Sequence, residues 1–362
     1  MLNNDNKMEL RSKAGENNYD VYNFDDAFSL YENIPSICIK ESAVNHPKFS
    51  IIIPTYNRPK TLKVTIDSAI YQFRYDDYYE ILIISNDPKS IDIENDTNKL
   101  ISSYHDEKIS FYVNSQNIGL CGNWNRGSEL AKGDYIVMIH DDDILGPFVL
   151  YSLNQVLNKY PSTGVIGCGN VKFVDKIPEF QEPQKIYYHE ITKRSFFFGY
   201  YIGIAGMTYR KDILKKIGGF NEKFYPNEDT NFIYQVLIIS TVISIDNQLT
   251  GYRVGINATL SCNLMDGIIT HMELLRRNIA EHEKFAKRWL DRYDKDYLIQ
   301  YIHSAENNWK IEVDGDSILS RFGLDNSSTS HNFSMKVAES IYGLYFRISK
   351  QKNITLKGQI HL

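Results

Sequence analysis

The feature that most constrains the fold of this chain is a series of short apolar runs separated by helical patterns. Residues 49–53, 81–84 and 135–139 are nearly continuous in apolar side chains, which is typical of strands buried on both faces. A further short strand is expected around Ile109–Val113. Between the first two runs, apolar residues recur at helical spacing: Leu62, Ile66, Ala69, Ile70 and Phe73. Alternating strands and helices predict an α/β fold with a mostly parallel sheet flanked by helices.

Polar residues follow three of these runs, at the points where the strands are expected to end. They occupy residues 54–58, 85–87 and 140–143. In parallel sheets, ligands bind beyond the carboxyl ends of the strands. We therefore expect the three segments to contribute to one site.

The third segment contains three adjacent aspartates, Asp141, Asp142 and Asp143, directly after a histidine. Mg²⁺ and Mn²⁺ prefer hard oxygen ligands and can bridge a diphosphate with one or two protein carboxylates. A solvated acidic turn or a helix N-cap is the alternative, and the position behind a buried strand favours the metal site. His140 is either a further ligand or a strand-end histidine in an ordinary hydrogen bond.

A second acidic pair, Glu228 and Asp229, precedes an apolar helix. A carboxylate in a partly buried pocket can have a raised pKa and accept a proton from an attacking hydroxyl. The alternative is helix capping, because acidic side chains at a helix start are favoured by the helix dipole. Taken alone, the pair favours capping.

Composition limits the classes of function. A net charge of −5 does not favour a nucleic-acid-binding protein, which usually carries a basic excess. The four cysteines are widely spaced, so they indicate reduced thiols and neither a disulfide framework nor a zinc site. A polar N-terminus and interrupted apolar stretches predict no signal peptide and no membrane span. The expected location is the cytoplasm or the inner face of its membrane.

Five motifs, in this order, resemble the family 2 glycosyltransferases, which have the GT-A fold. The resemblance covers about residues 49–261 and rests on these segments: Ile51–Arg58, Asn117–Gly119 with Asn125, Gly127, Ala131, Gly133 and Tyr135, His140–Asp143 at the family's DXD position, Gly218–Phe220, and Glu228–Asp229. Three departures are clear. His140 stands where the first aspartate of the acidic segment is common. Ser85-Asn86-Asp87 stands where two aspartates are frequent, and Gly255 stands where many relatives carry a histidine after a Tyr-Arg pair.

The resemblance implies a nucleotide-binding side of the site. Four residues at the end of the first strand would contact the base and the ribose of the nucleotide: Pro54, Thr55, Tyr56 and Arg58. Asn86 or Asp87 would contact the base, and Asn125 would lie near the donor phosphates.

The resemblance also implies the reacting side of the site. Asp142, with Asp141 or Asp143, would bind Mn²⁺ or Mg²⁺ on the donor diphosphate. Asp229, with Glu228 beside it, would act as general base in a single displacement that inverts the anomeric carbon.

The expected organisation has three parts. Residues 1–48 form an N-terminal extension, and residues 263–362 form a C-terminal helical region. Residues 49–262 form the glycosyltransferase domain, with a nucleotide-binding half at 49–145 and an acceptor half at 146–262. The implied activity is that of a hexosyltransferase: a nucleotide-sugar, first of all a UDP-sugar, donates to a hydroxyl of a glycan, lipid-linked or protein-linked acceptor. By analogy, the context is synthesis of a bacterial surface polysaccharide or glycoprotein glycan.

Other interpretations stay open. A catalytically degenerate domain that binds glycan or nucleotide is one alternative, and a sugar nucleotidyltransferase is another, although it should carry a glycine-rich basic loop after the first strand. The aromatic residues between Tyr187 and Tyr209 either pack in the core or line an acceptor cleft. The C-terminal helices could form a homodimer interface. Their basic residues either form a solvated face or contact an anionic membrane: Arg276, Arg277, Lys284, Lys287, Arg288 and Arg292.

Overall fold

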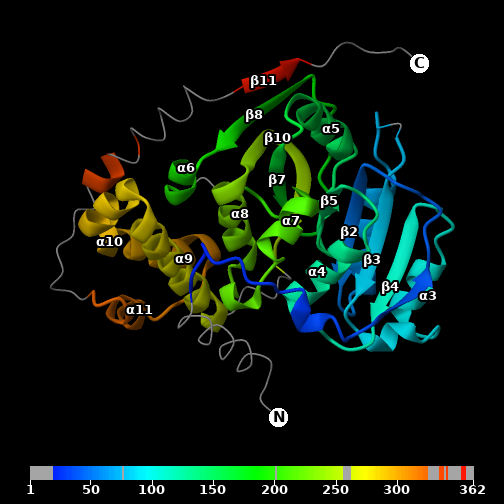
Figure 1. The fold of residues 1–362 in the computed structure, drawn as a ribbon, viewed down its shortest axis with the longest axis horizontal. Helices are drawn as coiled ribbons and strands as arrows, with labels where there is room; N and C mark the ends of the chain where they lie inside the picture. Colours follow the sequence, from blue (N-terminus) through cyan, green and yellow to red (C-terminus); the bar gives the residue numbers. More distant parts are fainter. Residues whose placement is uncertain are drawn as a thin grey trace.

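The computed structural model describes residues 19–75, 77–199, 202–255, 262–324, 334–337, 340 and 352–355. In this part of the chain, one sheet is flanked by helices, and a group of C-terminal helices lies beside it (Figure 1). The α/β class and the C-terminal helical region predicted from the sequence are confirmed.

Eleven strands of the described residues form the sheet. Their bounds are β1 Ser36–Lys40, β2 Phe49–Thr55, β3 Glu80–Ser85, β4 Ile109–Asn114, β5 Tyr135–Met138, β6 Ile144–Leu145, β7 Thr163–Phe173, β8 Lys185–Ile191, β9 Met207–Arg210, β10 Thr241–Arg253 and β11 Lys352–Thr355. Their spatial order is β1-β4-β3-β2-β5-β9-β7-β10-β8-β11, and β6 pairs with β10.

The sheet is parallel from β4 to β5, and antiparallel pairs adjoin this part on both sides. Strands β4, β3, β2 and β5 are parallel neighbours. Strand β9 then pairs antiparallel with both β5 and β7, while β10 is parallel to β7 and antiparallel to β8. The prediction of a mostly parallel sheet therefore needs correction beyond β5, because the apolar pattern of a short strand such as β9 carries no information about its direction.

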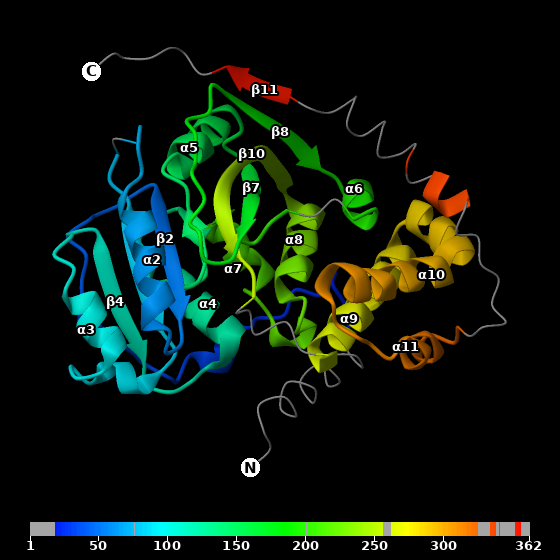
Figure 2. The same cartoon turned by 180° about the vertical axis from the view of Figure 1, so that it is seen from behind.

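Helices cover both faces of the sheet, which Figures 1 and 2 show from opposite sides. The bounds of the α-helices are α2 Pro59–Ile70, α3 Asp96–Ser102, α4 Gly119–Leu130, α5 Val149–Lys159, α6 Lys193–Phe197, α7 Lys211–Ile217, α8 Glu228–Ile239, α9 Cys262–His282, α10 Lys284–Ser304 and α11 Gly315–Arg321. Short 3₁₀ turns span Ser29–Tyr31 (η1), Pro88–Ile91 (η2) and Glu222–Phe224 (η3), and a π-helical turn spans Ala305–Trp309 (η4).

The central strands are buried on both faces, as their continuous apolar runs predict. Ile51 and Ile53 of β2 have no exposed surface and pack in one cluster with residues of α2 and α5. Ile52, between them, points to the opposite face and packs in a second cluster with residues of α4, α7 and α8. Successive side chains of a strand point to opposite faces, so a run without polar residues requires two cores.

The described part of the predicted N-terminal extension packs along the rest of the chain. Strand β1 pairs antiparallel with β4. The backbone N–H of Val21 donates to Oδ1 of Asn278 in α9 at 2.9 Å, and the N–H of Ala27 donates to the carbonyl of Gly218 at 2.8 Å. Arg126 of α4 donates to three groups of this segment: the carbonyls of Tyr31 and Ile34, and Ser36 Oγ.

The C-terminal helices do not present all of the predicted basic residues to solvent. Arg276 of α9 is only 1% exposed, donates to Glu273 at 3.0 Å, and lies over the ring of Tyr297. Arg277 donates to the same carboxylate at 2.8 Å. Lys284 and its basic neighbours along α10 are exposed. Within the described ranges, no helix is both long enough and apolar enough to span a bilayer.

Candidate active site

A cleft of about 350 Å³ lies at the carboxyl ends of β2, β3 and β5. The segments that line it are far apart in the sequence: the residues after each of these strands, the first turns of α4, and the start of α8. Its lining residues are Pro54, Thr55, Tyr56, Arg58, Asn86, Leu120, Asn123, Trp124, His140, Asp141, Asp142, Ile204, Pro226, Glu228, Asp229 and Tyr252. The acidic residues at 141–142 and at 228–229 thus lie on one cleft.

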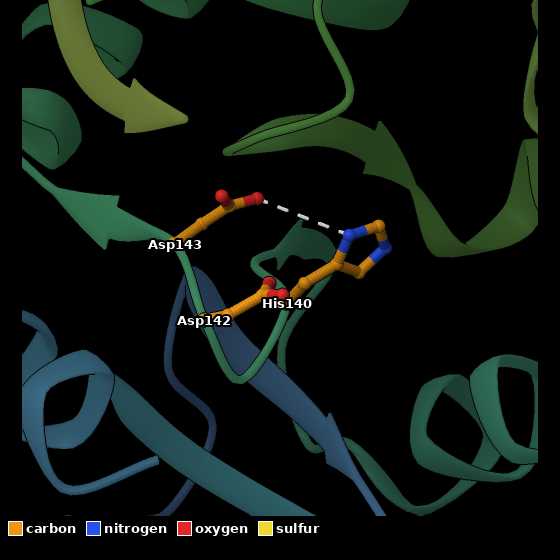
Figure 3. A group of neighbouring side chains, drawn as sticks. All are labelled: His140, Asp142 and Asp143. Carbon is orange, nitrogen blue, oxygen red and sulfur yellow. Dashed lines mark ion pairs between the residues drawn. The ribbon is translucent and has the colours of Figure 1, made fainter. Parts of the chain in front are cut away.

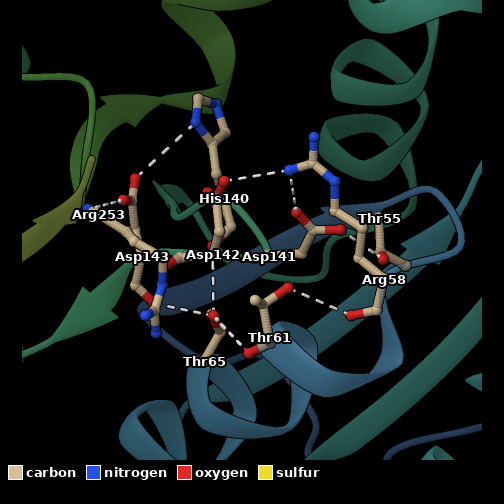
Figure 4. Close-up of polar contacts among 9 residues, drawn as sticks. All are labelled: Thr55, Arg58, Thr61, Thr65, His140, Asp141, Asp142, Asp143 and Arg253. Carbon is tan, nitrogen blue, oxygen red and sulfur yellow. Dashed lines mark hydrogen bonds and ion pairs between the residues drawn. The ribbon is translucent and has the colours of Figure 1, made fainter. Parts of the chain in front are cut away.

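The first two aspartates of the acidic loop are tied to the end of β2 (Figure 4). Thr55 donates its hydroxyl proton to Oδ2 of Asp141 at 2.7 Å. Nη1 of Arg58 lies 3.0 Å from Oδ2 of Asp142 and 3.4 Å from Oδ1 of Asp141. Burial raises the pKa of Asp141, and the bonds from Thr55 and Arg58 oppose that shift. A guanidinium ion therefore neutralises part of the negative charge at the strand ends.

The third aspartate is held by β10 and α2 (Figure 4). Oδ1 of Asp143 accepts the backbone N–H of Arg253 at 2.9 Å, and the hydroxyl of Thr65 donates to the carbonyl of Asp143 at 2.8 Å. Arg253 also donates from Nε to the carbonyl of Asp142 at 2.9 Å. Contacts from two other elements therefore fix the conformation of the loop.

His140, Asp142 and Asp143 could hold a metal ion together (Figure 3). One ligand atom from each lies within 4.8 Å of the others. Nδ1 of His140 is 3.9 Å from Oδ2 of Asp143, an oxygen that is buried without a hydrogen-bond partner. Burial raises the pKa of Asp143 to about 6. Two carboxylates and an imidazole suit Mn²⁺, and a cation would satisfy the unpaired oxygen.

Glu228 is the more deeply buried member of the acidic pair at the start of α8. It is 5% exposed, and its Oε2 has no hydrogen-bond partner among the described residues. Burial, followed by the negative charge of Asp229, raises its pKa to about 8. This carboxyl therefore carries a proton at neutral pH and can donate a hydrogen bond.

Asp229 is half-buried, and its carboxylate faces the same cleft. Oδ1 accepts the backbone N–H of Thr230 at 2.6 Å and its hydroxyl proton at 3.2 Å. Burial raises the pKa of Asp229, while these bonds and the nearby His140 lower it. Asp229 thus accepts a backbone N–H in the first turn of α8 and also lines the cleft. Helix capping and a place in the cleft therefore apply to the same side chain.

The predicted nucleotide side is only partly in the cleft. Tyr56 projects from it and is 55% exposed, next to Asn57, which has a left-handed backbone with φ of 53°. Asn86 lines the cleft, but its amide also donates to Asn117 and to the carbonyl of Gly119, at 2.9 Å each. Its oxygen accepts the backbone N–H of Ile118 at 3.0 Å. Asn86 therefore anchors the glycine turn before α4.

Asp87 and Asn125 do not line the cleft. Asp87 instead accepts the backbone N–H of Lys89 at 3.1 Å, as the N-cap of η2. Both ends of the Asn125 amide are bonded to the backbone of Phe220: Nδ2 donates to its carbonyl and Oδ1 accepts its N–H, at 2.8 Å each. The side chain is 1% exposed, and its amide has a structural role here; the position near the donor phosphates stays a prediction. Asn125 joins α4 to the loop that leads to α8.

The sequence analysis missed Trp124, which precedes Asn125 in α4. Its ring stacks on His140, with centroids 5.5 Å apart and an interplanar angle of 21°, and it lines the cleft. A tryptophan inside an amphipathic helix is usually a core residue, so helical periodicity alone could not find it. Its position next to a motif asparagine was the only available signal.

The aromatic segment between residues 187 and 209 belongs mainly to the core. Tyr188, Phe196 and Phe197 are at most 2% exposed. From this segment, only Ile204 is among the described residues that line the cleft. Two of its tyrosines, Tyr200 and Tyr201, lie outside the described residues. Gly255, which stands where many relatives carry a histidine, is described and has a left-handed backbone with φ of 100°.

Comparisons with known proteins agree with this geometry. Residues 50–218 match the model of the family described as Glycosyl transferase family 2. Over 191 residues, the chain is 30% identical to the GalNAc(5)-diNAcBac-PP-undecaprenol beta-1,3-glucosyltransferase of Campylobacter jejuni, covering 52% of this chain and 59% of the relative. It is 28% identical to an uncharacterized glycosyltransferase of Methanocaldococcus jannaschii, covering 52% and 64%. The chain thus spans about three fifths of the length of these relatives.

Two solved structures share the fold at low sequence identity. One is S. aureus TarS 1-349 in complex with UDP-GlcNAc, with a TM-score of 0.52, 16% identity, and coverage of 76% of this chain and 80% of the other. The second is the mannosyltransferase PcManGT from Pyrobaculum calidifontis in complex with GDP-Man and Mn²⁺, with a TM-score of 0.51, 11% identity and 94% coverage of both chains. The likeness concerns the fold, and the predicted GT-A architecture is confirmed. Residues 50–218, a little under half of the chain, are thus similar to glycosyltransferase family 2.

Proposed function

We propose that this chain transfers a sugar from a nucleotide-sugar to a hydroxyl of an acceptor, with inversion at the anomeric carbon. The observation that carries the proposal is the cleft itself. An acidic loop suited to a diphosphate and a carboxylate suited to proton removal line the same cavity, which is large enough for a sugar. The family match and the nucleotide-sugar complexes of the structural relatives support the same class of reaction.

The nucleotide would lie at the ends of β2 and β3. Tyr56 offers an exposed ring for stacking, and Arg58 offers a cation close to the diphosphate. Asn86 would shape this end through the glycine turn that it anchors. We accordingly assign residues 49–145 to donor binding and residues 146–262 to the acceptor side of the domain.

Asp142, Asp143 and His140 would hold a divalent cation, with Mn²⁺ as the first candidate. When bound, the cation would stabilise the negative charge on the departing nucleoside diphosphate. Arg58 lies 3.0–3.4 Å from Asp141 and Asp142, and its guanidinium offsets part of the negative charge of these carboxylates.

Asp229 would act as the general base. It would take the proton of the acceptor hydroxyl as that oxygen forms its bond to the anomeric carbon, while the bond from this carbon to the phosphate oxygen breaks. Glu228 carries its proton at neutral pH because its pKa is about 8, so it would donate a hydrogen bond rather than compete for the proton. The two neighbouring carboxyls thereby take different roles because their burial differs.

The acceptor class follows less directly from the site. The name of the Campylobacter jejuni relative describes a lipid-linked acceptor, which makes a lipid-linked glycan the first candidate. Exposed basic residues on α10, such as Lys284 and Arg288, would then favour contact with an anionic membrane. Glycan and glycoprotein acceptors, and a homodimer through the C-terminal helices, are further proposals.

A donor-hydrolysis assay tests the function. The protein is incubated with UDP-, GDP- and TDP-sugars and Mn²⁺, without acceptor, and released nucleotide is measured. We expect slow release from one donor class, because glycosyltransferases hydrolyse their donors when water replaces the acceptor. Absence of release from every donor at high enzyme concentration would instead support a degenerate binding domain.

The Asp229→Asn variant tests the base. We expect transfer to fall by about 10²–10⁴-fold, the usual contribution of a general base, with nucleotide affinity close to that of the wild type. Asp212→Asn is the matched control, since that carboxylate is exposed on α7. Equal losses of transfer and of nucleotide affinity would remove Asp229 from the base role.

A further inference from the structure

The indole N–H of Trp124 has no partner in the described structure, although it lies beside the cleft. The side chain is 3% exposed, and Nε1 is buried without a hydrogen bond. Its ring contacts two aromatic side chains: it stacks on His140, and the ring of Phe220 is 5.1 Å away in an edge-on contact. A buried tryptophan N–H normally donates to an acceptor, so the lack of an acceptor for Trp124 among the described residues needs an explanation.

Two other cleft residues share this property. Nε2 of His140 and Oε2 of Glu228 are also buried without a partner. The three atoms come from three elements, namely α4, the loop after β5 and the start of α8. All three residues line the same cleft. Unsatisfied polar groups from separate elements around one cavity indicate a ligand with several oxygens.

The position of this group indicates which part of a donor it meets. The nucleotide side of the cleft is formed by Tyr56 and Arg58 at the end of β2. Trp124 instead stacks on His140 of the acidic loop, and both residues line the cleft together with Asp229. The residues that carry the unpaired atoms therefore line the cleft together with Asp141, Asp142 and Asp229, the carboxylate that would remove the acceptor proton. In a nucleotide-sugar, this is the place of the transferred sugar.

We propose that the N–H of Trp124 donates a hydrogen bond to a hydroxyl of the transferred sugar, and that Trp124, His140 and Glu228 form its binding subsite. This inference rests on the proposed function and deepens it. Sugar hydroxyls both donate and accept hydrogen bonds, so they match a site that combines a pure donor, an imidazole and a carboxyl group. A small shift of the cleft side chains lets the hydroxyl reach Nε1, since side-chain rearrangements on binding are common.

The Trp124→Phe variant tests the contact, because it keeps an aromatic ring next to His140 and removes the N–H together with part of the indole ring. Binding of UDP, GDP, UDP-GlcNAc, UDP-glucose and GDP-mannose is measured by calorimetry with Mn²⁺ for the wild type, for Trp124→Phe and for the control Trp289→Phe in α10. We expect Trp124→Phe to weaken the sugar-nucleotide that the wild type binds by about 5- to 30-fold, the value of one hydrogen bond. Affinity for the free nucleoside diphosphate and all affinities of the control should stay unchanged.

A deoxy-sugar analogue of the same donor separates the contact from a structural effect. The wild type should bind the analogue that lacks the contacted hydroxyl as weakly as Trp124→Phe binds the normal donor. The variant should bind the donor and the analogue with equal affinity. Equal weakening of the nucleotide and the sugar-nucleotide would assign Trp124 to the diphosphate and overturn the inference, as would unchanged affinities. Failure of the wild type to bind any nucleotide would instead contradict the proposed function. Thermal melting establishes that each variant is folded.

Discussion

Replacement of Asn125 by alanine should lower the stability of the fold and have little effect on the affinity for the nucleotide donor. The substitution removes two buried hydrogen bonds of 2.8 Å and leaves the N–H and the carbonyl of Phe220 without partners. A buried polar group left unpaired costs about 1–3 kcal/mol, so the free energy of unfolding should fall by about 2–6 kcal/mol. A domain has about 5–15 kcal/mol in total, so this loss is a large part of its stability.

Urea denaturation of Asn125→Ala, the wild type and Asn158→Ala measures this change. Asn158 is an exposed residue of α5 that accepts one bond from Lys48, so its alanine variant should stay within about 0.5 kcal/mol of the wild type. Nucleotide affinity is measured on the folded proteins at low urea. An unchanged urea midpoint together with a tenfold loss of nucleotide affinity would refute the structural role and support the phosphate contact predicted from the sequence.

Two further predictions concern the acidic residues. Asp142→Ala should weaken nucleotide binding in the presence of Mn²⁺ and leave binding without metal close to that of the wild type; an unchanged dependence on Mn²⁺ in calorimetry would assign the cation to other ligands. Glu228→Gln should gain stability relative to the wild type as pH rises. The pKa of Glu228 is raised from 4.5 to about 8, so the unfolded chain loses this proton first and the wild type loses stability between these pH values. Denaturation midpoints at pH 5 and pH 8 measure the difference, and an equal difference at both would contradict the buried, protonated carboxyl.

The strand ends were the most predictable part of the site. Thr55, Arg58 and Asp142 directly follow apolar runs, and a parallel sheet brings the ends of such runs to one edge. The local pattern therefore predicted both their role as cleft residues and their proximity. Glu228 and Asp229 could be placed on the same cleft only through the family resemblance, because more than 80 residues of sequence separate them from the acidic loop.

Amide side chains were the least predictable part. Asn86 and Asn125 occupy motif positions, and both use their amides to bind backbone groups of loops. An asparagine donates and accepts equally well to a ligand or to a peptide group. Which of these it meets depends on where distant loops pass, and the sequence around the asparagine does not contain that information.

The sequence by itself determined the buried strands, the alternating helices and the acidic loop, since each of these is a pattern of neighbouring residues. Only the tertiary structure decided that β9 runs antiparallel to β5, that Trp124 stacks on His140, and that Glu228 is buried enough for its pKa to be raised to about 8. These properties arise from contacts between residues distant in the chain. Burial and pairing set the energy of a polar group, and both are properties of the packed molecule rather than of the local sequence.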